Sequence, residues 1–160
     1  MKSTNITITM KKIMKFAVCL AAMLLTFSAY ASEKDLYGRW VLSQVENGII
    51  AMTSFDFHED GGVNMKLLVQ SSSPKMELEA DASGTYTYKG STATCKFNKD
   101  DIEISKLEID GLSGSLREMA IQQQKSEMAK SDIKITDISI NGNVMTATIE
   151  GETVTLNKIQ

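Results

Sequence analysis

Apolar and polar residues alternate with a period of two along most of the chain after residue 36. Such alternation is typical of strands that bury one face and expose the other. The clearest runs are residues 63–69, 75–80 and 92–97. Turn signals rich in Gly, Asn or Asp separate the runs at residues 47–48, 60–62, 99–101, 141–142 and 150–151. The pattern therefore predicts about nine strands, joined mostly by short turns.

Two of the predicted strands change face part of the way along. Ile102 and Ile104 share one face, but Leu107 has the opposite parity, so we expect a bulge or break near residues 105–106. The same slip recurs at residues 136–137. Two matching slips suggest neighbouring strands that bend together at the corner of a barrel.

One helical stretch interrupts the strands, at about residues 113–130. Leu116, Met119 and Met128 recur there at roughly helical spacing, and residues 115–118 resemble a capping box that begins with Ser115. Short connections force neighbouring strands to be antiparallel, and a long sheet with one apolar face must close or fold onto itself. We therefore expect a mainly β fold: an antiparallel up-and-down barrel of about 8–9 strands with one inserted helix. A sandwich is the second choice.

The first 31 residues have the layout of a secretory signal peptide. Lys11, Lys12 and Lys15 precede an apolar stretch of 12 residues, 16–27, and residues 29–31 read Ala-Tyr-Ala. The apolar stretch is too short to span a membrane as a helix. We expect cleavage after Ala31, which leaves a single domain of residues 32–160 in the periplasm or outside the cell.

The charge and the cysteine content limit which binding partners and which anchors the protein can have. Four of the 17 basic residues lie in residues 1–31, so the remainder carries 13 basic and 20 acidic residues, a net charge of −7. This balance argues against nucleic acid and against an anionic lipid surface. Cys19 lacks the flanking residues of a lipid-anchoring site and would leave with the signal, so Cys95 has no partner for a disulfide. We expect a monomer without a lipid anchor or a transmembrane segment.

No catalytic motif stands out. His58 is the only histidine and is followed by Glu59 and Asp60, a set that more often marks the polar end of a strand than a metal site. Cys95 lies on the apolar face of its strand, as a small core residue does. Glu77 and Glu79 occupy a polar face and do not form an acid/base pair. We therefore expect neither an enzyme nor a bound metal or cofactor.

The inward faces of the predicted strands combine aromatic residues with methionines. A barrel of about eight strands is either filled by its side chains or holds one small ligand, and the pattern leaves both readings open. If a ligand binds, the expected contacts are Phe55, Phe57, Met65, Leu67, Tyr86 and Tyr88.

Residues 36–40, Leu-Tyr-Gly-Arg-Trp, contain the Gly-x-Trp pattern at Gly38 and Trp40. With Phe55-Asp56-Phe57 and Gly61-Gly62 downstream, the chain resembles the small exported lipocalin-like (calycin-type) proteins of Bacteroides and its relatives. The resemblance implies that Gly38 and Trp40 are structural residues, with Trp40 closing the bottom of the barrel. It also implies a small hydrophobic ligand in the cup.

The chain departs from the lipocalin pattern at three points. Lipocalins usually stack an Arg on this Trp, but no Arg follows Arg117, and Lys158 is the only basic residue in the last strand. The disulfide of many lipocalins is impossible here, and three predicted strands follow the helix where the family has one. We expect an exported binder of a small apolar or amphipathic molecule. The alternative is a filled barrel that works as a non-enzymatic interaction module in the envelope.

Overall fold

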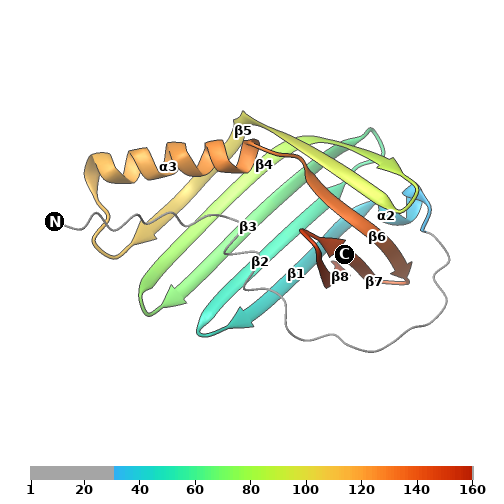
Figure 1. The fold of residues 1–160 in the computed structure, drawn as a ribbon, viewed down its shortest axis with the longest axis horizontal. Coiled ribbons are helices and arrows are strands. Elements are labelled where there is room, and N and C mark those ends of the chain that lie inside the picture. The colour runs from blue at the N-terminus through green and yellow to red at the C-terminus, as the bar shows by residue number, and fades with distance from the viewer. Residues whose placement is uncertain (1–30, 160) are drawn as a thin grey trace.

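Eight antiparallel strands form a closed up-and-down barrel in the computed structural model, which describes residues 31–159 (Figure 1). Apart from Ala31, the expected signal peptide lies outside the described residues. The elements, in chain order, are α2 (Glu33–Leu36), β1 (Gly38–Glu46), β2 (Ile49–Phe57), β3 (Gly62–Ser72), β4 (Lys75–Lys89), β5 (Thr92–Ile109), α3 (Gly114–Ala129), β6 (Ile133–Asn141), β7 (Val144–Ile149) and β8 (Glu152–Ile159). The predicted lipocalin-like barrel is confirmed.

The turns between strands follow the local chemistry. Asn47 and Gly48 both have positive φ, at 49° and 77°, and so do Glu150 and Gly151, at 52° and 84°. Two successive residues with positive φ match the right-handed twist of the flanking strands, which is why such turns make tight hairpins. These two sites connect β1 to β2 and β7 to β8, as the sequence predicted.

The barrel is closed by two short ladders at one end. β1 pairs with β8 only over Arg39–Val41, and β5 pairs with β6 only over Ala93–Cys95. Beyond these ladders, β1 to β5 continue as a curved sheet, which we call the extended sheet (Figure 1). The ring of eight paired strands is the closed end, and the extended sheet forms the open end.

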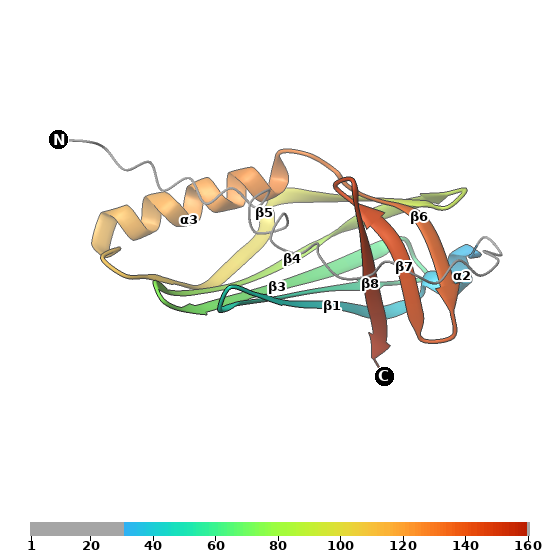
Figure 2. The same ribbon diagram turned by 60° about the horizontal axis from the view of Figure 1, so that its bottom comes forward.

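α3 lies on the same side of the extended sheet as β6, β7 and β8 (Figure 2). Its main contacts are with β5, and Met128 is its one buried residue. Leu116 and Met119, which recur at helical spacing in the sequence, are 59% and 67% exposed. The expected capping box at Ser115 is wrong, because the helix begins at Gly114 and its N-cap is Ser113. A capping box does occur at Ser32 and Asp35, where it opens α2.

The expected turn at residues 99–101 is also wrong, because the chain keeps its direction there and stays within β5. In the β4–β5 ladder, Gly84 pairs with Phe97 and Ala82 pairs with Ile102. One residue of β4 thus opposes residues 98–101 of β5, all of them exposed, and Asn98 donates a hydrogen bond to Asp101. A polar run that cannot join the ladder bulges out of it, and the two predicted strands become one.

The two predicted register slips are both present. Between Glu79 and Ala80 the β4–β5 register shifts at Ser105, and the β6–β7 register shifts between Thr136 and Ser139. The hypothesis that the two strands bend together is wrong. Ser105 lies far along β5 from the segment that pairs with β6, whereas Ile138 donates its backbone N–H to the carbonyl of Ser91, just before β5.

Candidate functional site

Trp40 lies in the closed end, within the short β1–β8 ladder, and is fully buried. Its indole N–H donates a 2.7 Å hydrogen bond to the carbonyl oxygen of Leu36, the last residue of α2. The ammonium of Lys158, from β8, lies 5.1 Å from the centre of the indole ring. Gly38 has φ of +106°, and a Cβ there would lie 2.9 Å from Cε of Lys158. Strand β1 therefore meets β8 around this one indole ring, beneath the buried Leu36 of α2.

An aromatic cluster lies in the closed end and includes Phe55, the cross-strand partner of Trp40. The rings of Phe55 and Phe57 stack with centroids 6.2 Å apart, and Tyr86 meets Phe57 edge-on at 5.0 Å. The Tyr86 hydroxyl donates to the backbone carbonyl of His58, and burial raises its pKa to about 12. Tyr88 donates to the carbonyl of Ala31 at 2.6 Å. Both tyrosine hydroxyls thus donate to backbone carbonyls, while the Phe55, Phe57 and Tyr86 rings pack against each other.

The six residues expected to contact a ligand all lie on the inner face, but at different depths. Five of them are at most 5% exposed: Phe55, Phe57, Met65, Leu67 and Tyr86. Tyr88 is partly buried. Phe55 on β2 and Met65 on β3 are cross-strand partners, so the predicted ligand residues of these two strands are neighbours. Contact between a ligand and these residues stays a prediction, and their mutual packing occupies the closed end.

The inner face of the extended sheet is apolar as well. Its centre is buried at Val69 and Leu78, and partly exposed residues surround this centre. These surrounding residues are Leu42, Ala51, Thr53, Met76, Ile104 and Ile109. They continue the same period-two pattern that marked the closed end, so the alternation could have found them. The sequence-based prediction placed the ligand among four aromatic residues with Met65 and Leu67, and it missed this second group.

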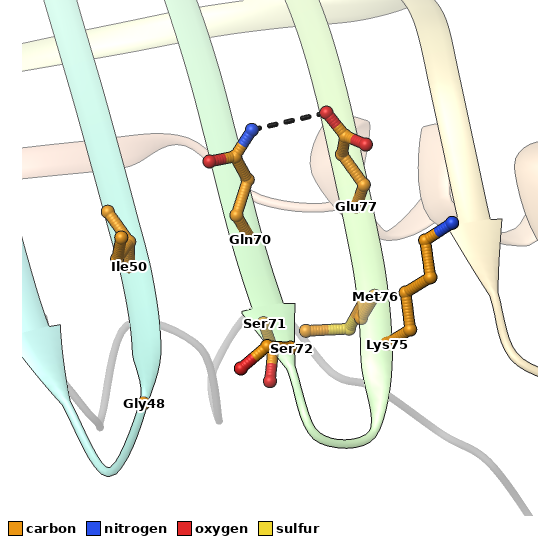
Figure 3. Close-up of a pocket in the computed structure, with 8 residues that line it drawn as sticks. All are labelled: Gly48, Ile50, Gln70, Ser71, Ser72, Lys75, Met76 and Glu77. Carbon is orange, nitrogen blue, oxygen red and sulfur yellow. Dashed lines mark hydrogen bonds between the residues drawn. The ribbon is translucent and has the colours of Figure 1, made fainter.

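A pocket of about 460 Å³ lies at the free end of the extended sheet, between the β1–β2 turn and the β3–β4 hairpin (Figure 3). We call it the rim pocket. It is lined by Gly48, Ile50, Gln70, Ser71, Ser72, Lys75, Met76 and Glu77. The pair of Ser71 and Met76 belongs to the inner face, and the pair of Gln70 and Glu77 belongs to the outer face. Ile50, Ser72 and Lys75 share the outer face with that second pair, so the rim pocket lies mostly on the outer face, with Ser71 and Met76 at its inner edge.

The charged residues of the rim pocket are held by partners on neighbouring strands. Glu77 is bonded to the Lys106 ammonium at 2.8 Å and to the Gln70 amide at 3.1 Å. The Lys106 hydrogen bond holds the pKa of Glu77 below its usual value, and the same bond raises the pKa of Lys106. Lys75 lies 3.7 Å from Glu108, and its backbone N–H donates to Asp110. Lys75 and Glu77 on β4 are thus each paired with an oppositely charged residue on β5.

His58 belongs to a polar chain at the surface of the closed end. Its Nε2 lies 3.0 Å from the Asn64 amide nitrogen, and the Ser83 hydroxyl donates to the Asn64 amide oxygen. Ser83 thus has a hydrogen bond to Asn64 and is linked to the His58 imidazole only through that amide. Among residues 31–159, no group of three or more His, Cys, Asp or Glu side chains is arranged to hold a metal.

Cys95 is buried within the barrel core. Burial raises the pKa of its thiol to about 12, with a further rise from the negative charge of Asp132. The group is therefore protonated at neutral pH, and a protonated, enclosed thiol is a poor nucleophile. Its position agrees with the core role that the alternation predicted.

No protein-family model matches the chain, and no curated protein matches it. Across the described residues, no helix is both long and apolar enough to cross a membrane.

Proposed function

We propose that this chain is an exported lipocalin-like protein that binds a small apolar or amphipathic molecule at the open end of its barrel. The observation that carries the proposal is the apolar inner face of the extended sheet, which continues past the ring of closure. Partly exposed Leu42, Ala51 and Met76 remain there, while the closed end is packed with aromatic rings. Apolar concave surfaces with a few polar groups nearby are the usual setting of small-molecule sites.

Neighbouring residues on opposite faces of β2 give a matched test. Ala51 lies on the inner face, and Met52 is 37% exposed on the outer face. Ala51→Trp would fill the inner face, whereas Met52→Trp would add the same ring outside. With the fluorescent apolar probe N-phenylnaphthylamine, we expect Ala51→Trp to weaken binding at least tenfold and Met52→Trp to leave it unchanged. Equal binding by both variants would count against an inner-face site.

A second candidate function is the envelope interaction module, and one observation favours it. Val45 and Ile50 form a cross-strand pair on the outer face and are 72% and 43% exposed. Met52 pairs with Leu68 beside them on the same face. Contiguous exposed apolar groups often mark contact sites for other proteins. If Met52→Trp, rather than Ala51→Trp, removed probe binding, this outer surface would be the functional one.

A further inference from the structure

The rim pocket offers neutral hydrogen-bonding groups between two apolar side chains. The hydroxyls of Ser71 and Ser72 and the amide of Gln70 line it, with Ile50 on one side and Met76 on the other. Gly48 has no side chain, and the position where a Cβ would stand has nothing within 4 Å, so this wall is open. A ligand group seated here could both hydrogen-bond and rest against hydrocarbon.

The charges beside the pocket are turned away from its hydroxyls. In Figure 3 the Lys75 ammonium points toward β5, away from Ser71 and Ser72, in line with its ion pair to Glu108. One Glu77 oxygen accepts from Gln70 and the other from Lys106, which leaves the carboxylate doubly engaged. An ionised carboxylate bonded in this way is already compensated.

A charged ligand group would compete with these pairs, strongly at Glu77–Lys106 and weakly at the exposed Lys75–Glu108 pair. An anion that recruited Lys75 would take it from Glu108 and would stand close to the carboxylates of Glu77 and Asp110. A cation that recruited Glu77 would compete with Lys106 at 2.8 Å and would face Lys75 as well. A neutral group that carries several hydroxyls displaces neither Lys75 nor Glu77 from its partner. It can form hydrogen bonds with the hydroxyls of Ser71 and Ser72 and with the Gln70 amide.

Met76 connects this polar pocket with the apolar inner face. Its side chain extends from β4 toward β3 (Figure 3), and it shares the inner face with buried Leu78, two residues along the strand. Its cross-strand partners are Ser71 on β3 and Ile109 on β5. Because β3 and β4 stay paired as far as Ser72 and Lys75, a hydrocarbon chain that starts in the rim pocket would pass around the free end of the sheet, beside Met76, to reach the inner face.

We propose that the rim pocket holds the neutral polyhydroxyl head group of an amphipathic ligand, such as a glycerol or sugar unit, whose hydrocarbon part lies on the inner face. This inference rests on the proposed function and adds the ligand class to it. The pocket volume of about 460 Å³ lies within the usual range for small-molecule sites.

The test uses four ligands with a common decyl chain and different head groups, each below its micellar concentration: decyl glucoside, a monoacylglycerol, decanoate and decyltrimethylammonium. Calorimetric titration of the protein at physiological salt measures each affinity. We expect the two neutral ligands to bind about tenfold more tightly than the two charged ones, which corresponds to about one or two extra hydrogen bonds. The tighter of the two neutral ligands identifies the head as a sugar or a glycerol unit.

The matched variants are Ser71→Ala with Ser72→Ala, against Ser73→Ala in the same hairpin. Ser73 does not line the rim pocket. We expect the double variant to lower affinity for the neutral ligands about fivefold and to leave the charged ligands unchanged, since about 1 kcal/mol of hydrogen bonding is lost. Ser73→Ala should change neither. Circular dichroism spectra of the three proteins should coincide.

The possible results distinguish a failure of the head-group proposal from a failure of the proposed ligand-binding function. Equal affinity for all four ligands, or tightest binding of decanoate or decyltrimethylammonium, would overturn the neutral head group while leaving a binder of hydrocarbon chains. Preference for neutral ligands that the double variant does not alter would place the head group elsewhere and also overturn the inference. If none of the four ligands binds, the proposed function fails together with it.

Discussion

The ammonium of Lys158 lies 5.1 Å above the indole ring of Trp40, where the last strand of the barrel meets the first. Lipocalins usually place an arginine on this tryptophan, and here a lysine takes the position. The same lysine approaches Gly38, where any side chain would come within 2.9 Å of its Cε. The closure of the barrel and the Gly-x-Trp pattern are therefore parts of one contact.

Removing the Lys158 side chain should loosen this closure. We expect Lys158→Ala to lower the free energy of unfolding by about 1 kcal/mol, since a cation over a buried indole contributes on that order. Lys158→Arg should retain most of the stability because its guanidinium can stack on the same ring. Urea unfolding followed by Trp40 fluorescence measures both. Lys134→Ala, at an exposed position of β6, is the control, and an equal loss there would argue against a specific contact.

Gly84 should be the glycine least tolerant of a side chain. A Cβ at this position would lie 2.1 Å from the backbone oxygen of Lys96 and 2.7 Å from Cδ1 of Phe97. Because backbone must move to make room, we expect Gly84→Ala to cost about 3 kcal/mol, whereas Thr85→Ala beside it should cost much less. Thermal unfolding measures both. Similar melting temperatures for the two variants would mean that β5 yields easily at its bulge.

The Cys95 thiol should be inert in the folded protein. In a Cys19→Ser background, a chromogenic disulfide reagent should react with Cys95 at neutral pH only after the barrel opens. The raised pKa also predicts that stability is fully present below pH of about 8.5 and declines as pH rises above that value, because the unfolded thiol ionises first. Cys95→Ala should remove this alkaline decline. Rapid modification of the native protein would show that the core opens locally.

Asp35 should make stability depend on pH on the acidic side. Its carboxylate accepts hydrogen bonds from the backbone N–H and the hydroxyl of Ser32, at 2.8 and 2.7 Å, and these bonds lower its pKa. A lowered pKa contributes stability above the unfolded value of about 4, and this contribution is lost as pH falls through the folded pKa. Asp35→Asn should therefore reduce the difference between urea midpoints at pH 7 and pH 3.

The predicted cleavage after Ala31 would strengthen this pair. It would turn the Ser32 N–H into an ammonium group beside the Asp35 carboxylate. A chain that begins at Ser32 should then lose more stability on Asp35→Asn than the same chain with Gly-Ser added in front. Equal losses in the two chains would show that the charge at Ser32 does not contribute.

The alternation of residues was sufficient to predict the barrel, and the reason is physical. Inward residues such as Met65 and Leu78 must alternate with solvated ones, and a one-residue slip such as that at Ser105 leaves a visible change of parity. The polar run at residues 98–101 misled the prediction because a bulge and a chain reversal favour the same residues.

The candidate site was harder to predict because it depends on distant contacts. The resemblance drew attention to Lys158 as the one basic residue of the last strand, but its contact with Trp40 forms only when the barrel closes. The rim pocket likewise brings Gly48 next to the β3–β4 hairpin, through the pairing of β2 with β3. Four of the six ligand residues chosen from sequence are aromatic, and aromatic side chains also pack well against each other, as Phe57 and Tyr86 do.

Native mass spectrometry of the protein purified from its source tests the central proposal most directly. We expect the mass of the folded chain plus one amphipathic molecule, which denaturation releases and which Ala51→Trp excludes. A folded protein that carries no added mass, and that takes up none of the four decyl ligands, would contradict it.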